Sequence, residues 1–123
     1  MIRILLLCGE NNRAKFYASI LKKNENCIVT GLLYGISKGS NKLTSNINID
    51  SNTKNYLNSL NVNIPSLDKD IESIFRDNNW QYTVTQEREV NKDEIITKIR
   101  ESDCDYVVFA GYGGQILSKE HFL

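Results

Sequence analysis

The sequence has no excess of charge of either sign, since its 123 residues carry 15 lysines and arginines against 15 aspartates and glutamates. A basic excess would favour a nucleic-acid partner, and this balanced composition does not point to one. Only a local basic patch would provide such a binding surface. The hydrophobic share of 41% and the charged share of 24% are those of an ordinary globular protein. At this length we expect one domain over residues 1–123, with a real hydrophobic core.

Long apolar runs are also missing. The apolar stretch at residues 4–8 is too short for the core of a signal peptide, and no small-residue cleavage pattern follows it. Nothing approaches the roughly 20 consecutive apolar residues that a membrane-spanning helix needs. We therefore expect neither a signal peptide nor a membrane span.

Cysteine and histidine are scarce, with three of the first and one of the second. Cys8, Cys27 and Cys104 lack the spacing of metal ligands, and each lies in or beside an expected strand, where a free cysteine behaves as a small buried hydrophobe. A nucleophilic Cys8 would need a lowered pKa and usually a histidine partner, and the sequence does not bring His121 close to it. We expect no metal site, no catalytic cysteine and a reducing, cytoplasmic compartment.

Apolar segments alternate with amphipathic segments along the chain. The unbroken apolar run at residues 2–8 is typical of a central parallel strand that is covered on both faces. Expected strands are 2–8, 27–34, 80–85 and 105–110, and expected helices are 11–23, 53–60, a segment capped by Ser66 that reaches Phe75, and a segment that begins at Asp93. This order predicts an α/β fold with a doubly wound, mostly parallel sheet and helices on both faces.

One segment departs from this alternation. Eight asparagines lie between residues 41 and 63, and residues 36–63 also hold several serines and lysines and one glycine. Such a composition favours turns over regular structure. We expect a flexible insertion at about residues 36–63, with a short helix near its end.

The first candidate site is Cys-Gly-Glu-Asn-Asn at residues 8–12, where a strand meets a helix. Backbone N–H groups at a helix N-terminus attract phosphate or carboxylate groups. Gly9 would let the chain turn, Asn11 and Asn12 offer side-chain donors, and Glu10 would repel an anion. The stretch has neither the G-x-G-x-x-G spacing nor the ending of a P-loop, so an ordinary turn with an asparagine cap is the alternative.

The second candidate site is Ala-Gly-Tyr-Gly-Gly-Gln-Ile-Leu at residues 110–117. Its glycines let the backbone approach a ligand closely, and backbone groups from Gly114 to Leu117 would bond a flat heterocycle. Ile116 and Leu117 would supply an apolar wall. A glycine-rich connection with both side chains packed in the core is the alternative.

The segment DYVVFAGYGGQILSKEHFL resembles the N-terminal, Rossmann-like domain of folate-dependent formyltransferases, the family of methionyl-tRNA, glycinamide ribonucleotide and sugar-amine formyltransferases. The opening MIRILLLCGENN is also similar to that family's start. The resemblance implies that Gln115, Ile116 and Leu117 line the pterin pocket for 10-formyltetrahydrofolate, mainly through their backbone. It implies that residues 9–12 lie near the acceptor amine, on a nucleotide-linked amino sugar or on methionyl-tRNA.

The sequence departs from the family's pattern in two ways. The loop has one glycine more than the usual spacing. The family's Asn-x-His element and later aspartate, which do the chemistry, are not found, because Lys119 stands two residues before His121. The chain resembles only the first half of a catalytic domain, so we expect these 123 residues alone to be inactive.

Two other classes of function stay open. The chain would also suit a module that holds a nucleotide or another anion at residues 9–12 without catalysis. It would equally suit an interaction domain, including a homo-oligomer, that pairs through an exposed sheet edge.

Overall fold

The computed structural model describes residues 1–37, 50–61, 64–65 and 67–122. The elements in chain order are β1 (Ile2–Cys8), α1 (Asn12–Lys22), β2 (Cys27–Leu33), α2 (Ser51–Ser59), α3 (Ile71–Asp77), β3 (Gln81–Val84), α4 (Asp93–Glu101), β4 (Tyr106–Ala110) and the short 3-10 helix η1 (Lys119–Phe122).

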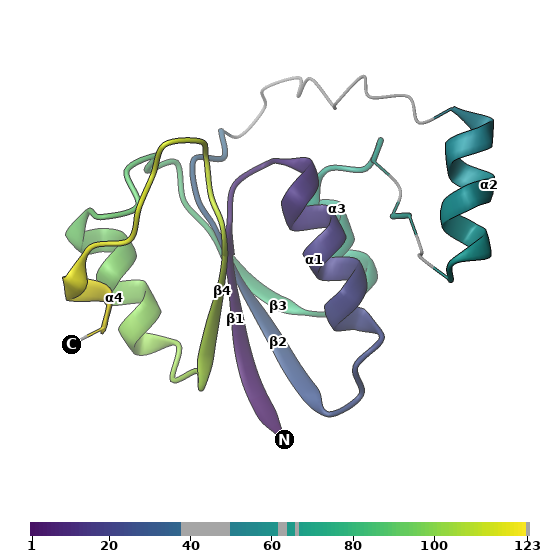
Figure 1. The fold of residues 1–123 in the computed structure, drawn as a ribbon. Helices are drawn as coiled ribbons and strands as arrows, with labels where there is room; N and C mark the ends of the chain where they lie inside the picture. Colours follow the sequence, from purple (N-terminus) through teal and green to yellow (C-terminus); the bar gives the residue numbers. More distant parts are fainter. Residues whose placement is uncertain (38–49, 62–63, 66, 123) are drawn as a thin grey trace.

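The four strands form one parallel sheet in the order β3-β2-β1-β4. Helices α1 and α3 lie on one face of this sheet, and α4 lies on the other (Figure 1). This arrangement confirms the expected doubly wound α/β fold, which is Rossmann-like. The chain moves from β1 to β2 and β3 in one direction and then returns to β4 on the far side of β1. The strand order therefore reverses between β1 and β4, which is the usual place for a ligand in an open α/β sheet.

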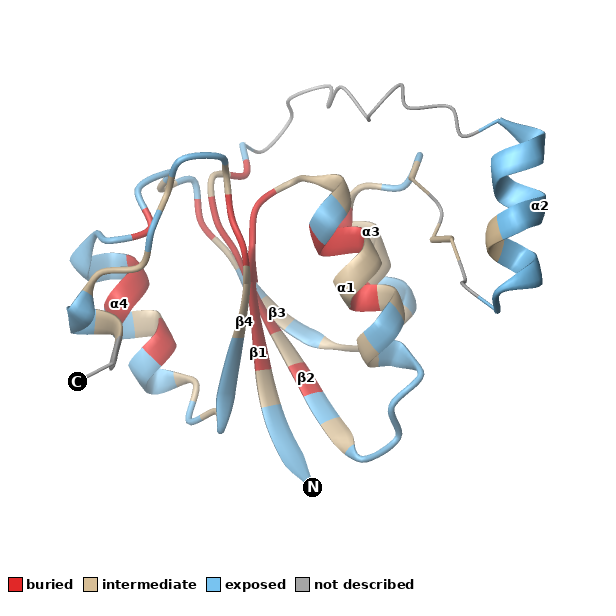
Figure 2. Cartoon of the chain, in the orientation of Figure 1, coloured by how far each residue is buried: buried red, intermediate tan, exposed pale blue. Residues whose placement is uncertain are grey.

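Strand β1 is buried on both faces in its second half, as its unbroken apolar run predicts. Leu6 and Cys8 face the core under α1 and α3, while Leu5 and Leu7 face the core under α4. Figure 2 shows this burial along the centre of the sheet and on the helix surfaces that face it. The two cores hold the strands together, so their carboxyl ends form a fixed edge.

Helix starts follow local capping chemistry. Asn11 caps α1 by accepting from the N–H of Ala14, as expected. The expected cap at Ser66 is wrong for α3, which begins at Ile71 and is capped by Asp70 through the N–H of Ser73. The residues before Ile71 share its apolar pattern, but the Asp70 cap fixes the first turn further along the chain.

Half of the asparagine-rich segment expected at residues 36–63 lies outside the described residues, since 38–49 and 62–63 are not described. The short helix expected near its end is present as α2, and it buries none of its side chains. Among the described residues, no helix has both the length and the apolar character needed to cross a bilayer.

Candidate functional site

The two candidate segments lie side by side where the strand order reverses. The N–H of Gly9 donates to the carbonyl oxygen of Ala110 at 3.1 Å. The Asn11 amide nitrogen donates to the carbonyl oxygens of Ala110, at 2.9 Å, and Gly111, at 3.3 Å. The Arg13 guanidinium donates to the carbonyl of Gly111 at 2.7 Å. The loop after β4 is therefore bonded directly to the start of α1.

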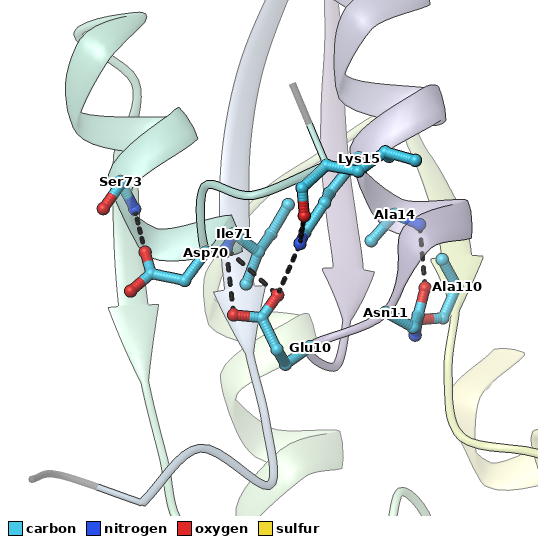
Figure 3. A network of polar contacts seen from close by, with 9 residues as sticks. Glu10, Asn11, Ala14, Lys15, Asp70, Ile71, Ser73 and Ala110 are labelled. Carbon is cyan, nitrogen blue, oxygen red and sulfur yellow. Dashed lines mark hydrogen bonds and ion pairs between the residues drawn. The ribbon is translucent and has the colours of Figure 1, made fainter. Parts of the chain in front are cut away.

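Both the oxygen and the nitrogen of the Asn11 side-chain amide are hydrogen-bonded within the protein. Its oxygen accepts from the N–H of Ala14 at 2.8 Å, and its nitrogen holds the chain beyond β4. Figure 3 shows the side chain pointing from the start of α1 towards Ala110. Asn12 is the first residue of α1 and is half-buried. The N-terminus of α1 is thus already capped by the chain itself.

Glu10 points the other way, between α1 and α3 (Figure 3). Both carboxylate oxygens lie 3.1 Å from the backbone nitrogen of Ile71, the first residue of α3. One of them lies 3.8 Å from Nζ of Lys15, a side chain that is only 2% exposed. Lys15 also donates to the carbonyl of Leu67 at 3.0 Å. Glu10 therefore anchors α3 and balances a buried positive charge.

Two glycines at the strand ends allow an aromatic ring to pack against the backbone. A Cβ atom on Gly9 would lie 2.5 Å from the Tyr112 ring, and one on Gly35 would lie 2.6 Å from it. Gly35 also has φ +66°, a conformation that side chains rarely adopt. Tyr112 therefore covers Gly9, one of the residues 9–12 that were expected to lie near a ligand.

The loop after β4 has exposed residues next to residues that are held by contacts with the rest of the protein. Gly114 has φ +83°, and no described atom lies within 4 Å of where its side chain would be. The Gln115 side chain is bonded to Tyr34 and to the carbonyl of Arg88. Ile116 is 80% exposed, whereas Leu117 packs against the core under α4. Gly113, Gly114 and Ile116 are the exposed parts of this loop, which a ligand would reach.

Sequence reasoning missed several residues that organise this edge. Tyr34 and Tyr112 interact across the ends of β2 and β4, and Arg88 lies over the Tyr112 ring. Asn91 donates to the carbonyl of Ile116 and accepts from the N–H of Ser118. The two tyrosines stood beside glycines at strand ends, which was a usable signal. Arg88 and Asn91 lie in a polar stretch without any motif.

His121 lies on η1, far along the loop that follows β4. Its Nε2 is 3.1 Å from the Asn91 side-chain oxygen. Burial lowers the pKa of His121 below its ordinary value and so favours the neutral imidazole. No group of three or more histidine, cysteine or carboxylate side chains among the described residues is arranged to hold a metal ion.

Cys8 is fully buried, and burial raises the pKa of its thiol well above the ordinary value, helped by the charge of Glu10. We expect iodoacetamide to leave Cys8 unmodified in the native protein at pH 8 and to modify it in denaturant, as mass spectrometry of the peptides would show. Cys27 and Cys104, both partly exposed, provide the internal comparison. Rapid native modification of Cys8 would show that its thiol is an accessible thiolate.

The fold and this edge define an α/β, Rossmann-like protein with two loops joined where the strand order reverses. Comparison with protein families, with curated proteins and with solved structures gave no match for this chain.

Proposed function

We propose that this chain is the folate-binding part of a formyltransferase, which transfers a formyl group from 10-formyltetrahydrofolate to an amine on a nucleotide-linked amino sugar or on methionyl-tRNA. The observation that carries the proposal is the position of the loop at residues 110–117. This loop, which resembles the family's pterin-binding segment, follows β4 at the carboxyl edge and is bonded to the start of α1. Open α/β sheets bind their ligands at this place.

The loop has groups that suit a flat heterocycle with polar edges. Gly114 exposes its backbone, and the exposed side chain of Ile116 offers an apolar surface next to it. The Gln115 carboxamide is bonded within the protein, so this residue would contact a pterin through its backbone, in keeping with the resemblance. Leu117 would support the pocket from the core side.

Formyl transfer needs a donor for the oxyanion of a tetrahedral intermediate and a base for the amine proton. The proposal assigns neither role within this chain. The His121 side chain contacts Asn91 and is not directed at a free binding position, and Cys8 is buried. The proposed role of the loop at residues 110–117 is therefore to hold the formyl donor. The acceptor is an amine on a nucleotide-linked amino sugar or on methionyl-tRNA.

The structure bears on the rival anion-binding module. The N-terminus of α1 is capped by Asn11, and Tyr112 covers Gly9. A phosphate at residues 9–12 would have to displace both contacts. These contacts favour the folate proposal over a nucleotide site at α1.

We expect calorimetric titration with 10-formyltetrahydrofolate to show one binding site and titration with nucleotides to show none. Replacing Ile116 with serine should weaken folate binding roughly tenfold, because a pterin would no longer bury a large aliphatic side chain. Ile20→Ser is the matched control, since Ile20 is 65% exposed on α1. An equal loss of affinity in both variants, or no heat with the folate, would refute the proposal.

The interaction-domain alternative has one observation in its favour. Strand β4 pairs with β1 on one side only among the described residues, and Tyr106 on this strand is 64% exposed. Such an edge recruits partner strands. Sedimentation over a range of protein concentrations separates the two, because a chain that stays monomeric and binds folate does not need this edge.

A further inference from the structure

Four residues join the loops that follow β2, β3 and β4. The Tyr112 N–H donates to the Tyr34 hydroxyl oxygen at 3.1 Å, and that hydroxyl donates to the Gln115 side-chain oxygen. The Gln115 side-chain nitrogen donates to the carbonyl of Arg88 at 2.6 Å. The Arg88 guanidinium lies 4.7 Å from the centre of the Tyr112 ring. The contacts therefore form a closed circuit that begins and ends at Tyr112. Each residue of this circuit holds the next.

Tyr34 is the fully buried member of the circuit. Its ring stacks on Phe109 and meets Tyr112 edge-on, with centroid distances of 6.5 Å and 5.3 Å. Burial raises the pKa of the Tyr34 hydroxyl, which therefore keeps its proton and can donate to Gln115. The polar contacts of this side chain are all made by its hydroxyl. A phenylalanine would preserve the ring contacts and remove these hydrogen bonds alone.

The loop needs such anchors because its middle has few contacts of its own. No described atom lies within 4 Å of a side-chain position at Gly113 or Gly114. Glycine loses more conformational freedom on ordering than any other residue. The Tyr34 hydroxyl holds the loop on either side of these two glycines, at Tyr112 through the backbone and at Gln115 through the side chain.

We infer that Tyr34 is a positioning residue, whose hydroxyl sets the conformation of residues 112–115, the part of the loop between its two hydrogen-bond partners. Resting on the proposed function, the inference adds that this hydroxyl raises the affinity for the folate, because a loop ordered before binding loses less entropy when the ligand arrives. Tyr34 itself contacts no ligand in this scheme.

The test compares Tyr34→Phe with Tyr82→Phe. The Tyr82 hydroxyl donates to Glu72 at 2.9 Å, away from the loop, so the control removes one tyrosine hydroxyl that also donates to a side chain. Tyr34→Phe should speed amide hydrogen exchange at residues 112–115 roughly tenfold, the effect of losing an anchoring hydrogen bond, while exchange in α1 and α3 stays as in the wild type. It should weaken folate binding roughly tenfold, and Tyr82→Phe should do neither.

The outcomes separate the inference from the proposed function. Unchanged exchange at residues 112–115 in folded Tyr34→Phe overturns the positioning role. Faster exchange together with wild-type folate affinity overturns the link to binding. Faster exchange in a protein whose wild type binds no folate upholds the positioning role and refutes the folate function. If Tyr34→Phe does not fold, Gln115→Leu removes the same hydrogen bond, together with the bond from Gln115 to the Arg88 carbonyl, and should speed exchange at the same residues.

Discussion

Replacing Phe75 with alanine is expected to lower the free energy of unfolding by about 4 kcal/mol. Phe75 is fully buried on α3, and its ring meets Trp80 and Tyr82 edge-on at 5.3 Å and 5.8 Å between centroids. The ring also fills the space above Gly31 of β2, where an added Cβ atom would lie 2.7 Å from Cζ of Phe75. Alanine would leave a cavity between α3 and the sheet.

Urea denaturation followed by circular dichroism measures this effect. Tyr56→Ala is the aromatic control, because Tyr56 is 65% exposed on α2, and its change should stay within about 0.5 kcal/mol. Gly31→Ala tests the contact from the other side. It should destabilise the wild type by about 1 to 3 kcal/mol through overpacking and cost much less in the Phe75→Ala background. Additive losses would show that the ring does not pack on Gly31.

The sequence predicted the sheet because its signal is local and repeated. Uninterrupted apolar residues in β1 reflect burial on two faces, and the Asn11 cap is recognisable from residue type and position alone. The start of α3 was predicted too early because apolar periodicity extends to Leu67. Its true start depends on Asp70 and on Glu10, which lies 61 residues away in sequence.

In the candidate site too, features set by neighbouring residues could be predicted from the sequence, whereas features set by distant residues could not. Glycines at strand ends marked residues 8–12 and 110–117 as two candidate sites, but no local pattern reveals that they adjoin or how each side chain is used. Asn11 is bonded to a carbonyl 99 residues away, and Tyr34 to a side chain 81 residues away. Glu10 illustrates the consequence. As an isolated carboxylate it would repel an anion, whereas in the folded chain it is held by Ile71 and Lys15.

This arrangement predicts an asymmetry between the two charged partners at the start of α1. Replacing Glu10 with glutamine should lower the free energy of unfolding by about 3 kcal/mol, because it leaves the ammonium group of Lys15 buried without a counter-charge. Glutamine keeps an oxygen for the N–H of Ile71, so the variant tests the charge rather than that hydrogen bond. Lys15→Met keeps the apolar stem and removes the charge, and its change should stay within about 1 kcal/mol.

Chemical denaturation of the two single variants and of the double variant measures the asymmetry. The double variant should recover most of the stability lost in Glu10→Gln, since no unpaired ammonium group remains. A different role for Glu10, as a ligand for the acceptor amine, predicts another pattern. In that case Glu10→Gln would leave stability unchanged and weaken acceptor binding. Because the carboxylate points between α1 and α3, away from the loop after β4, we expect the first pattern.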